Sequence, residues 1–299
     1  MSKLLHGVIA ATATPLTADF APDVDRLLRH LQALLDGGCD GINLLGTTGE
    51  ATFFSIEQRL ALMRVVAESG LPLDRFMVGT GVPSLADTVR LTNAVCELGF
   101  AGALVLPPFF YPGITDEGLL DYMSELMRQV AHPRLAVYLY HIPQNTGVPW
   151  PIEVAVELRR RFGEPIAGLK DSSGDLSYAR AVVQAIDGFA VFPSSEASLA
   201  DADRDGYAGC ISATVNLTSE QSQAAWSGRS TETGARAAQQ ASRIRSLFAK
   251  YPLVSAVKHG LARRYADPEW ARVGPPLRPL GSAEAVMLMT ALDREETAA

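Results

Sequence analysis

Short apolar segments alternate with segments of helical periodicity through most of this chain, and this alternation restricts the possible folds more than any other feature. Residues 41–45 form a short, mostly apolar run, whereas residues 23–35 repeat apolar side chains at helical spacing. Apolar runs without polar alternation are typical of a parallel sheet covered on both faces. The predicted strands are residues 7–13, 41–45, 75–80, 102–106, 135–140, 166–169, 189–192 and 209–213, and the predicted helices that follow them are residues 23–35, 55–69, 84–98, 115–130, 151–161, 175–186, 196–204 and 218–226.

Eight strand–helix pairs in about 225 residues match the size of a (β/α)8 TIM barrel. A doubly wound open sheet is the alternative. It is disfavoured by the count of eight and by the lack of a phosphate-binding glycine pattern after the first strand. We therefore predict an α/β fold built on a TIM barrel.

The pattern changes near residue 230. Three helical segments follow, at residues 231–250, 253–265 and 282–296, separated by proline-containing stretches. We predict that residues 1–230 form the barrel with the active site, and that residues 231–299 form a C-terminal helical extension.

Composition argues against several classes of partner. The 299 residues carry a formal net charge of −7 and a pI near 5.3, which argues against a nucleic-acid or anionic-membrane surface. No run of 18 apolar residues occurs, so no transmembrane helix is expected. Ala11-Thr12-Ala13 imitates a signal-peptide cleavage site, but Pro15 follows at once and a first strand is the better interpretation. The cysteines are far apart and form no C-x-x-C pair, which suits a reducing cytoplasm: they are Cys39, Cys96 and Cys210.

The sequence offers no pattern for a metal or cofactor. The five histidines lack metal-ligand spacing. Residues 201–206 match the first half of a calcium loop, but its twelfth position is Ser212 instead of glutamate. Gly79-Thr80-Gly81 is an isolated G-x-G with no third glycine at the required spacing. We predict no metal and no cofactor.

A lysine ends the sixth predicted strand, and in a TIM barrel the chemistry lies at the carboxyl ends of the strands. Lys170 follows the apolar run of residues 166–169. Such a lysine can simply begin a surface loop, since lysine is almost never buried without a partner. It can also be an amine held in a dry pocket, where desolvation favours the neutral, nucleophilic form. Arginine could not serve in this way.

Other polar groups follow neighbouring strands. Thr47 and Thr48 lie between two glycines after the second strand, where hydroxyl and backbone N–H groups can hold a small carboxylate. Tyr140 ends the fifth strand and could transfer protons, although a buried, singly hydrogen-bonded tyrosine is an equally good interpretation. Residues 107–112 (P-P-F-F-Y-P) form a stiff aromatic loop suited to packing or to an oligomer contact. Together Thr47, Tyr140 and Lys170 would open onto one mouth of the barrel.

With these residues identified, the chain resembles the dihydrodipicolinate synthase / N-acetylneuraminate lyase family over nearly its whole length. The resemblance implies a TIM barrel, usually tetrameric, that forms a Schiff base between its lysine and the keto carbon of pyruvate or another 2-keto acid. The matching segments are residues 46–50 (G-T-T-G-E), 108–111, 140–147 (Y-H-I-P-Q-N-T-G), 168–172 (G-L-K-D-S) and 209–216.

The resemblance assigns a role to each matching residue. Lys170 would be the Schiff-base nucleophile, and Tyr140 the general acid and base. Thr47 would relay protons, Thr48 would hold the pyruvate carboxylate with nearby N–H groups, and Ile211 would line the site beside the lysine. These are implications of the resemblance.

Two positions depart from the family pattern. Many relatives carry tyrosine at Phe110, where it joins the proton relay of a neighbouring subunit, and whether Tyr111 replaces it is left open. Dihydrodipicolinate synthases carry arginine at Asn145 to bind the carboxylate of the second substrate. Asn145 is better suited to a hydroxyl or carbonyl, with Arg161 and Arg180 as the basic residues that could still reach the site.

We therefore expect a cytoplasmic, homotetrameric class I aldolase or lyase. Its substrates would be pyruvate with a small aldehyde, or a 2-keto-3-deoxy sugar acid. Three alternatives remain at this point: a 4-hydroxy-tetrahydrodipicolinate synthase, a dehydratase of keto-deoxy sugar acids, and a non-catalytic protein that binds keto acids.

Overall fold

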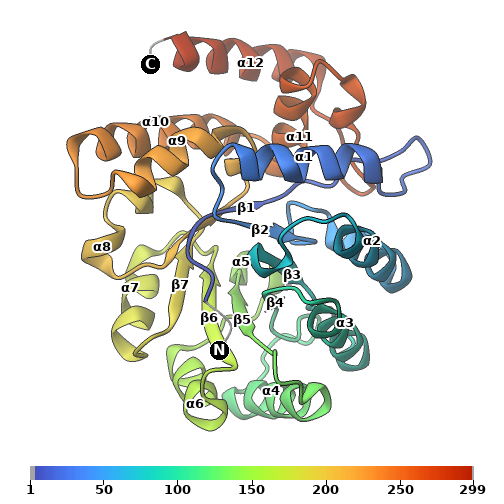
Figure 1. Cartoon of the computed structure of the whole chain (residues 1–299), viewed down its shortest axis with the longest axis vertical. Coiled ribbons are helices and arrows are strands. Elements are labelled where there is room, and N and C mark those ends of the chain that lie inside the picture. Colours follow the sequence, from blue (N-terminus) through green and yellow to red (C-terminus); the bar gives the residue numbers. More distant parts are fainter. Residues whose placement is uncertain (1–3, 298–299) are drawn as a thin grey trace.

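The computed structural model describes residues 4–297, and its eight parallel strands form a (β/α)8 barrel, as predicted (Figure 1). The paired strands run in the order β7-β6-β5-β4-β3-β2-β1-β8. The barrel closes where β8 lies beside β7, and there the Ala208 N–H donates to the Val191 carbonyl at 2.9 Å. The strands are β1 (Gly7–Ala11), β2 (Gly41–Leu44), β3 (Phe76–Gly79), β4 (Gly102–Val105), β5 (Val137–His141), β6 (Ile166–Asp171), β7 (Ala190–Pro193) and β8 (Gly209–Ser212).

Every strand residue is buried, because one face of the sheet packs on the outer helices and the other fills the barrel. The interior cluster contains Tyr138, Phe192 and Ile211 among smaller side chains. Gly168 leaves room for the Tyr138 ring, since a Cβ at Gly168 would lie 2.9 Å from it. The interior of the barrel is therefore a packed core and not a pore.

Helices alternate with the strands and cover the outside of the barrel. A capping box begins α2, because the Ser55 hydroxyl accepts from the Gln58 N–H while the Gln58 side chain accepts from the Ser55 N–H. The helices of the barrel are α1 (Val24–Asp36), α2 (Ile56–Glu68), α3 (Leu85–Leu98), α4 (Asp116–Val130), α5 (Pro143–Thr146), α6 (Ile152–Phe162), α7 (Leu176–Ala185), α8 (Ala202–Asp205) and α9 (Val215–Ser227), with 3-10 turns η1 (Ala51–Phe53), η2 (Leu73–Arg75) and η3 (Glu196–Leu199).

The structure corrects three local predictions. The single helix predicted at residues 196–204 is two short pieces, η3 and α8, because Glu196 turns inward to accept hydrogen bonds from the Ser212 and Thr214 hydroxyls. The short helix α5 follows β5 and was not predicted. The sixth strand, predicted to end at Lys170, continues one residue further to Asp171.

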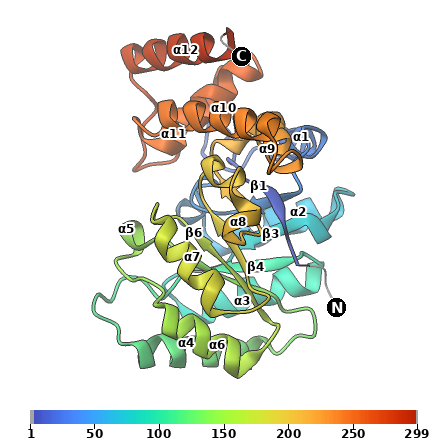
Figure 2. The ribbon, with the colours of Figure 1, turned by 90° about the vertical axis from the view of Figure 1, so that its left-hand side faces the viewer.

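Three helices follow the barrel, as predicted: α10 (Glu232–Phe248), α11 (Leu253–Arg264) and α12 (Ser282–Thr297), with the 3-10 turn η4 (Pro268–Ala271) between the last two. They stack beyond α1 and α9 on one side of the barrel (Figures 1 and 2). A separate apolar cluster that includes Phe248, Val257 and Trp270 holds them together. The predicted division of the chain at residue 230 into two domains stays a prediction.

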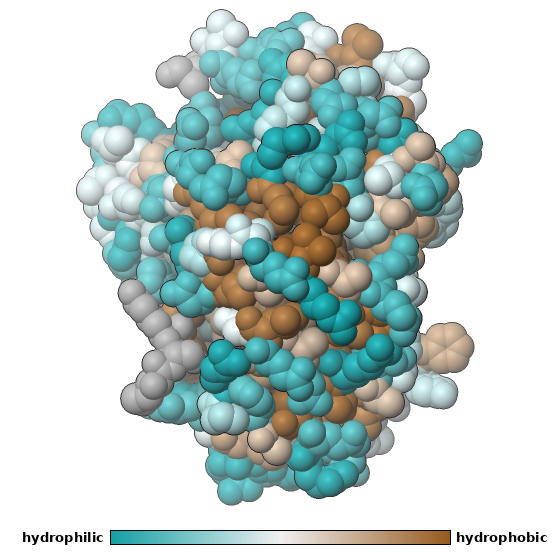
Figure 3. Space-filling model, turned by 45° about the vertical axis from the view of Figure 1, so that its right-hand side comes forward, coloured by the Kyte–Doolittle hydropathy of each residue, from teal (hydrophilic) through white to brown (hydrophobic). Residues whose placement is uncertain are grey.

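The surface over α1 to α3 is mostly polar, with a band of apolar side chains across its middle (Figure 3). Within residues 4–297, no helix is both long and apolar enough to cross a membrane.

Candidate active site

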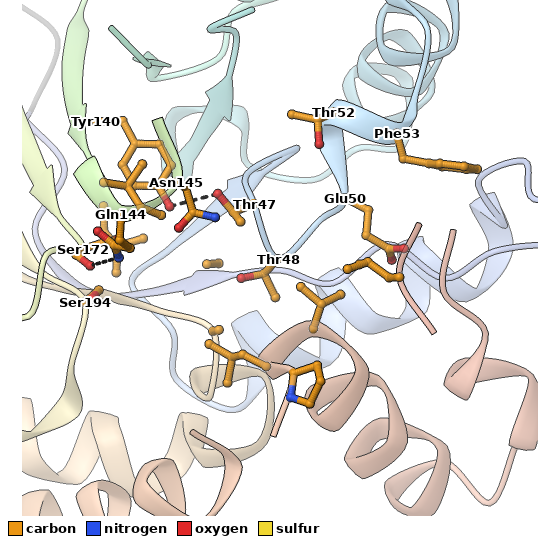
Figure 4. Close-up of a pocket in the computed structure, with 18 of the residues that line it drawn as sticks. Thr47, Thr48, Glu50, Thr52, Phe53, Tyr140, Gln144, Asn145, Ser172 and Ser194 are labelled. Carbon is orange, nitrogen blue, oxygen red and sulfur yellow. Dashed lines mark hydrogen bonds between the residues drawn. The ribbon is translucent and has the colours of Figure 1, made fainter. Parts of the chain in front are cut away.

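A cavity of about 750 Å³ lies at the carboxyl end of the strands and contains all six residues predicted for the site. Its walls come from both the barrel and the C-terminal helical region. Figure 4 shows Tyr140, Thr47 and Asn145 grouped on one side of it, with Thr48 nearer its middle. The predicted residues that line it are Thr47, Thr48, Tyr140, Asn145, Lys170 and Ile211.

Lys170 is the central polar group. It is 3% exposed and lies between β5 and β7, directly beside Tyr140 on one strand and Phe192 on the other. Its Nζ lies 4.4 Å from the centre of the Tyr140 ring and donates to Asn43 Oδ1 at 3.4 Å. No ion pair involves Lys170 within the described part of the chain. This is the environment expected for a reactive amine and not for a lysine that begins a surface loop.

Tyr140 connects Lys170 to the loop after β2. Its hydroxyl lies 3.1 Å from Thr47 Oγ1, and either oxygen can donate. Burial acts to raise the pKa of the Tyr140 phenol, but the charge on Lys170 and the hydrogen bond with Thr47 outweigh it, so that the pKa is lowered. A phenol with a lowered pKa beside an amine can both donate and accept a proton during a reaction.

The loop that carries Thr47 and Thr48 is fastened from both sides. Thr14 Oγ1 donates to the Gly49 carbonyl at 2.9 Å. On the other side, Glu50 forms a buried ion pair with Lys258 of α11 and accepts from the Gly274 N–H at 2.7 Å. Glu50, to which the sequence assigned no role of its own, joins the loop to the C-terminal helices in the structure. This role could not be found from the sequence, because the partner Lys258 lies more than 200 residues away along the chain.

The cavity wall on the same side as Tyr140 is otherwise polar and uncharged (Figure 4). It contains Gln144 and Asn145 of α5, with Ser172 after β6 and Ser194 after β7. Gln144 Nε2 donates to the Ser172 carbonyl at 2.7 Å, which joins α5 to the loop after β6 (Figure 4). This wall offers hydroxyl and amide groups to a bound molecule.

The charged residue that sequence reasoning missed is Arg245 of α10, which lines the same cavity. Its Nη1 donates to Ser212 Oγ at 3.1 Å, and its Nε lies 3.9 Å from Glu196 Oε2. The basic residues considered from the sequence do not line the cavity: Arg161 pairs with Glu157 and Arg180 with Asp205. The signal that could have found it is helical spacing, because Arg245 lies four residues after Ala241 and three before Phe248, on the buried face of that helix.

The comparisons with known proteins agree with this geometry. Residues 4–294 match the sequence profile of the Dihydrodipicolinate synthetase family. The chain belongs to that family. An uncharacterised DapA-like lyase of Chloroflexus aurantiacus is 33% identical over 97% of this chain and 96% of the relative. A 4-hydroxy-tetrahydrodipicolinate synthase of Cellvibrio japonicus is 32% identical over 72% of each chain. The crystal structure of a dihydrodipicolinate synthase from Agrobacterium tumefaciens superposes with a TM-score of 0.89 at 25% identity, covering 97% of this chain and 99% of that one.

Family membership confirms the predicted class. The chain is a Schiff-base-forming, pyruvate-dependent lyase of class I, built on a TIM barrel. The resemblance drawn from the five sequence segments is therefore confirmed, and four of those segments provide lining residues of the cavity.

The aromatic loop after β4 lies apart from the cavity of this family member. Phe110 and Tyr111 are 79% and 70% exposed, with ring centres 5.6 Å apart, and neither lines the cavity. Phe109 instead lines a smaller adjoining cavity of about 220 Å³, together with Thr47, Tyr140 and the buried Arg59. Within one chain, therefore, Tyr111 does not take the place of a relay tyrosine at Phe110.

Proposed function

We propose that this enzyme cleaves 2-keto-4-hydroxy acids into pyruvate and an aldehyde, or joins the two, with Lys170 as the Schiff-base residue. The observation that carries the proposal is the buried Lys170, lying 4.4 Å from the ring of a tyrosine whose hydroxyl contacts Thr47. The metal-ligand patterns absent from the sequence are not needed for this chemistry, because the iminium itself serves as the electron sink.

The first step forms the iminium. The neutral Lys170 amine attacks the C2 keto carbon, and one proton passes from nitrogen to the new hydroxyl. Tyr140 donates a proton as that hydroxyl leaves as water, which produces the iminium and a tyrosinate. Tyr140 is placed for this donation, because its ring lies 4.4 Å from the Lys170 Nζ.

The second step breaks the C3–C4 bond. The Tyr140 phenolate accepts the proton of the C4 hydroxyl, the C3–C4 electron pair moves into the iminium, and the aldehyde leaves. Tyr140 then returns its proton to C3 of the enamine, and water hydrolyses the resulting iminium to free pyruvate and the Lys170 amine. Thr47, at 3.1 Å from the phenol oxygen, relays protons to and from it.

The pyruvate end is held by the loop after β2. The Thr48 hydroxyl and the nearby backbone N–H groups donate to the C1 carboxylate, and Ile211 of β8 packs beside the reacting carbon. The buried pair of Glu50 with Lys258 keeps this loop in position during turnover.

A hydroxylated aldehyde, or the corresponding keto-deoxy sugar acid, fits the polar, uncharged side chains near Tyr140 best. Asn145, Gln144, Ser172 and Ser194 offer neutral hydrogen-bonding groups, and Asn145 stands where synthases of this family carry the arginine for aspartate semialdehyde. A 4-hydroxy-tetrahydrodipicolinate synthase is therefore the less favoured alternative. Turnover assays that measure released pyruvate separate the lyase from a dehydratase, which releases none, and from a binding protein, which has no turnover.

The exposed aromatic loop and the cysteines support a proposed assembly and a proposed cellular location. The exposed rings of Phe110 and Tyr111 are costly to leave in water, which supports a homotetramer with this loop at a subunit contact. Three free, buried cysteines support a cytoplasmic location.

The decisive experiment is borohydride reduction in the presence of pyruvate, followed by peptide mass spectrometry. The chain has four lysines, namely Lys3, Lys170, Lys250 and Lys258. We expect one reduced pyruvyl group on Lys170 alone, and no adduct in Lys170→Ala. An adduct on Lys250 or Lys258, or none on any lysine, contradicts the proposal.

A further inference from the structure

The cavity holds one cation whose role the proposed chemistry leaves unassigned. Three charged residues line it: Glu50, Lys170 and Arg245. Glu50 is neutralised by its buried pair with Lys258, and Lys170 is the proposed nucleophile. Arg245 therefore supplies the remaining formal charge on the cavity wall, and it comes from the C-terminal region and not from a strand of the barrel.

The guanidinium of Arg245 keeps most of its donors free. An arginine has five N–H donors in a planar fork. Within residues 4–297, Arg245 makes a single side-chain hydrogen bond, from Nη1 to Ser212 Oγ at 3.1 Å. The 3.9 Å from Nε to Glu196 Oε2 is too long for a hydrogen bond. The side chain is 22% exposed, and the cavity is where an acceptor can reach it.

Glu196 lies 3.9 Å from the Arg245 Nε and occupies none of the hydrogen-bond donors of the guanidinium. It is fully buried, and its carboxylate already accepts from the hydroxyls of Ser212, Thr214 and Thr218. These hydroxyls stabilise the carboxylate, and Ser212 lies between it and the Nη1 of Arg245. Glu196 and Ser212 thus orient the arginine while leaving its fork available for a bidentate acceptor.

We propose that Arg245 binds an anionic group at the far end of the substrate, either a carboxylate or a phosphate, an inference that rests on the function proposed above. The bound molecule would be a keto acid with its C1 carboxylate at Thr48, its keto carbon at Lys170, its hydroxyls along the wall of Gln144 and Asn145, and its second anion at Arg245. Lys170 and Arg245 line one continuous cavity of about 750 Å³, which is large enough for a six-carbon acid.

The test uses three substrates with one carbon skeleton. They are 2-keto-3-deoxygluconate, which ends in a neutral hydroxymethyl group, its 6-phosphate, and 2-keto-3-deoxyglucarate, which ends in a carboxylate. In the wild type we expect kcat/KM to be highest for one of the two anionic substrates, and that substrate identifies the anion. In Arg245→Gln we expect KM for it to rise about 10- to 100-fold, as for a lost hydrogen bond to a charged group, with kcat little changed. KM for the neutral substrate should stay within about twofold.

Two further variants control for structure. Arg243→Gln lies on the same helix, where Arg243 pairs with Glu295 away from the cavity, and it should behave as wild type. Arg245→Lys keeps the charge without the fork and should give an intermediate KM for the anionic substrate. An equal loss on all three substrates, or a wild type that prefers the neutral one, overturns the assignment of Arg245.

Failure of this inference is distinguishable from failure of the proposed function. Pyruvate carries no second anion, so borohydride trapping of pyruvate on Lys170 should be unchanged in Arg245→Gln. If pyruvate is trapped on Lys170 but the enzyme does not discriminate between the three substrates, only the role of Arg245 is rejected. Absence of trapping in the wild type rejects the Schiff-base proposal, and with it this inference.

Discussion

The two walls of the cavity differ in origin. The wall around Lys170, Tyr140 and Thr47 comes from the ends of barrel strands and the loop that follows one of them, and each group lies in a short local motif. The opposite wall is formed by α10, the segment that begins α11, and the turn near Gly274. The first wall contains the residues proposed for bond making and breaking, whereas the second contains Arg245 and the partners of Glu50. On these proposals, the C-terminal region adds a contact for the substrate to a reaction centre built by the barrel.

The largest expected effect is the loss of turnover when Lys170, in the barrel wall of the cavity, is replaced. Lys170→Ala should lower kcat by roughly ten-thousand-fold or more, because no other group can form the covalent intermediate. Steady-state release of pyruvate measures it. Lys250→Ala, at an exposed lysine, is the control and should keep wild-type activity. Substantial activity in Lys170→Ala would place the chemistry elsewhere in the cavity.

The buried ion pair between Glu50 and Lys258 joins the two walls, and breaking it should strongly lower the free energy of unfolding. Glu50→Gln leaves Lys258 buried without its counter-charge, and breaking such a pair typically costs about 3–5 kcal/mol. Urea unfolding at pH 7.5 gives the free energy of unfolding. Glu57→Gln removes one partner of the exposed pair with Arg90 and should leave that free energy nearly unchanged. Equal effects of the two substitutions would mean that the buried pair does not fasten the loop.

Tyr140→Phe should lower kcat by about 100- to 10,000-fold, because it removes the group proposed to transfer protons. Tyr138 is the matched control, since it is also buried on β5 but its hydroxyl accepts from the Leu5 N–H at 3.1 Å inside the barrel. Tyr138→Phe should lower stability by about 1 kcal/mol and leave kcat unchanged. A small effect of Tyr140→Phe on kcat would remove Tyr140 from the relay.

Within the loop after β2, the two threonines should separate binding from chemistry. Thr48→Val should weaken pyruvate binding by about 10- to 150-fold, the loss expected for a hydrogen bond to a charged group. Thr47→Val should mainly reduce kcat, because it removes the hydroxyl 3.1 Å from Tyr140. Steady-state kinetics at varied pyruvate measures both. Identical behaviour of the two variants would contradict this division of roles.

The smallest effect concerns how the C-terminal region is held against the barrel. His30 of α1 lies 2.8 Å from the Tyr265 hydroxyl and 2.8 Å from Asn216 Oδ1, and burial lowers its pKa from 6.5 to about 4. Between these values the unfolded chain binds the proton and the folded chain does not, so stability is full above pH 6.5 and falls as the pH drops toward 4. From pH 7.5 to pH 5 this amounts to about 2 kcal/mol.

Urea unfolding at the two pH values measures this contribution. In His30→Gln the loss of stability between pH 7.5 and pH 5 should shrink by about 2 kcal/mol, whereas the substitution His6→Gln, at an exposed position, serves as the control. An unchanged difference in His30→Gln would show that His30 does not link pH to the packing of the C-terminal region.

Most of the barrel could be predicted because its signals are local. A short apolar run predicts a buried strand, a helical period predicts the helix after it, and eight repeats of the pair predict the closed sheet. Lys170, Tyr140 and Thr47 could be found for the same reason, since parallel strands place their carboxyl ends at one edge. The division of residues 196–204 into η3 and α8 could not be found, because the cause is a hydrogen-bonded Glu196 whose partners follow β8.

The sequence by itself therefore determined the barrel, the family and the place of Lys170 at the carboxyl end of β6, all of which depend on patterns only a few residues long. Only the tertiary structure decided that Arg245, and not Arg161 or Arg180, lines the cavity, and that Glu50 pairs with Lys258. The physical reason is distance along the chain. A side chain on a helix has several neighbours to choose from, and the packing of α10 and α11 against the barrel selects which one it contacts.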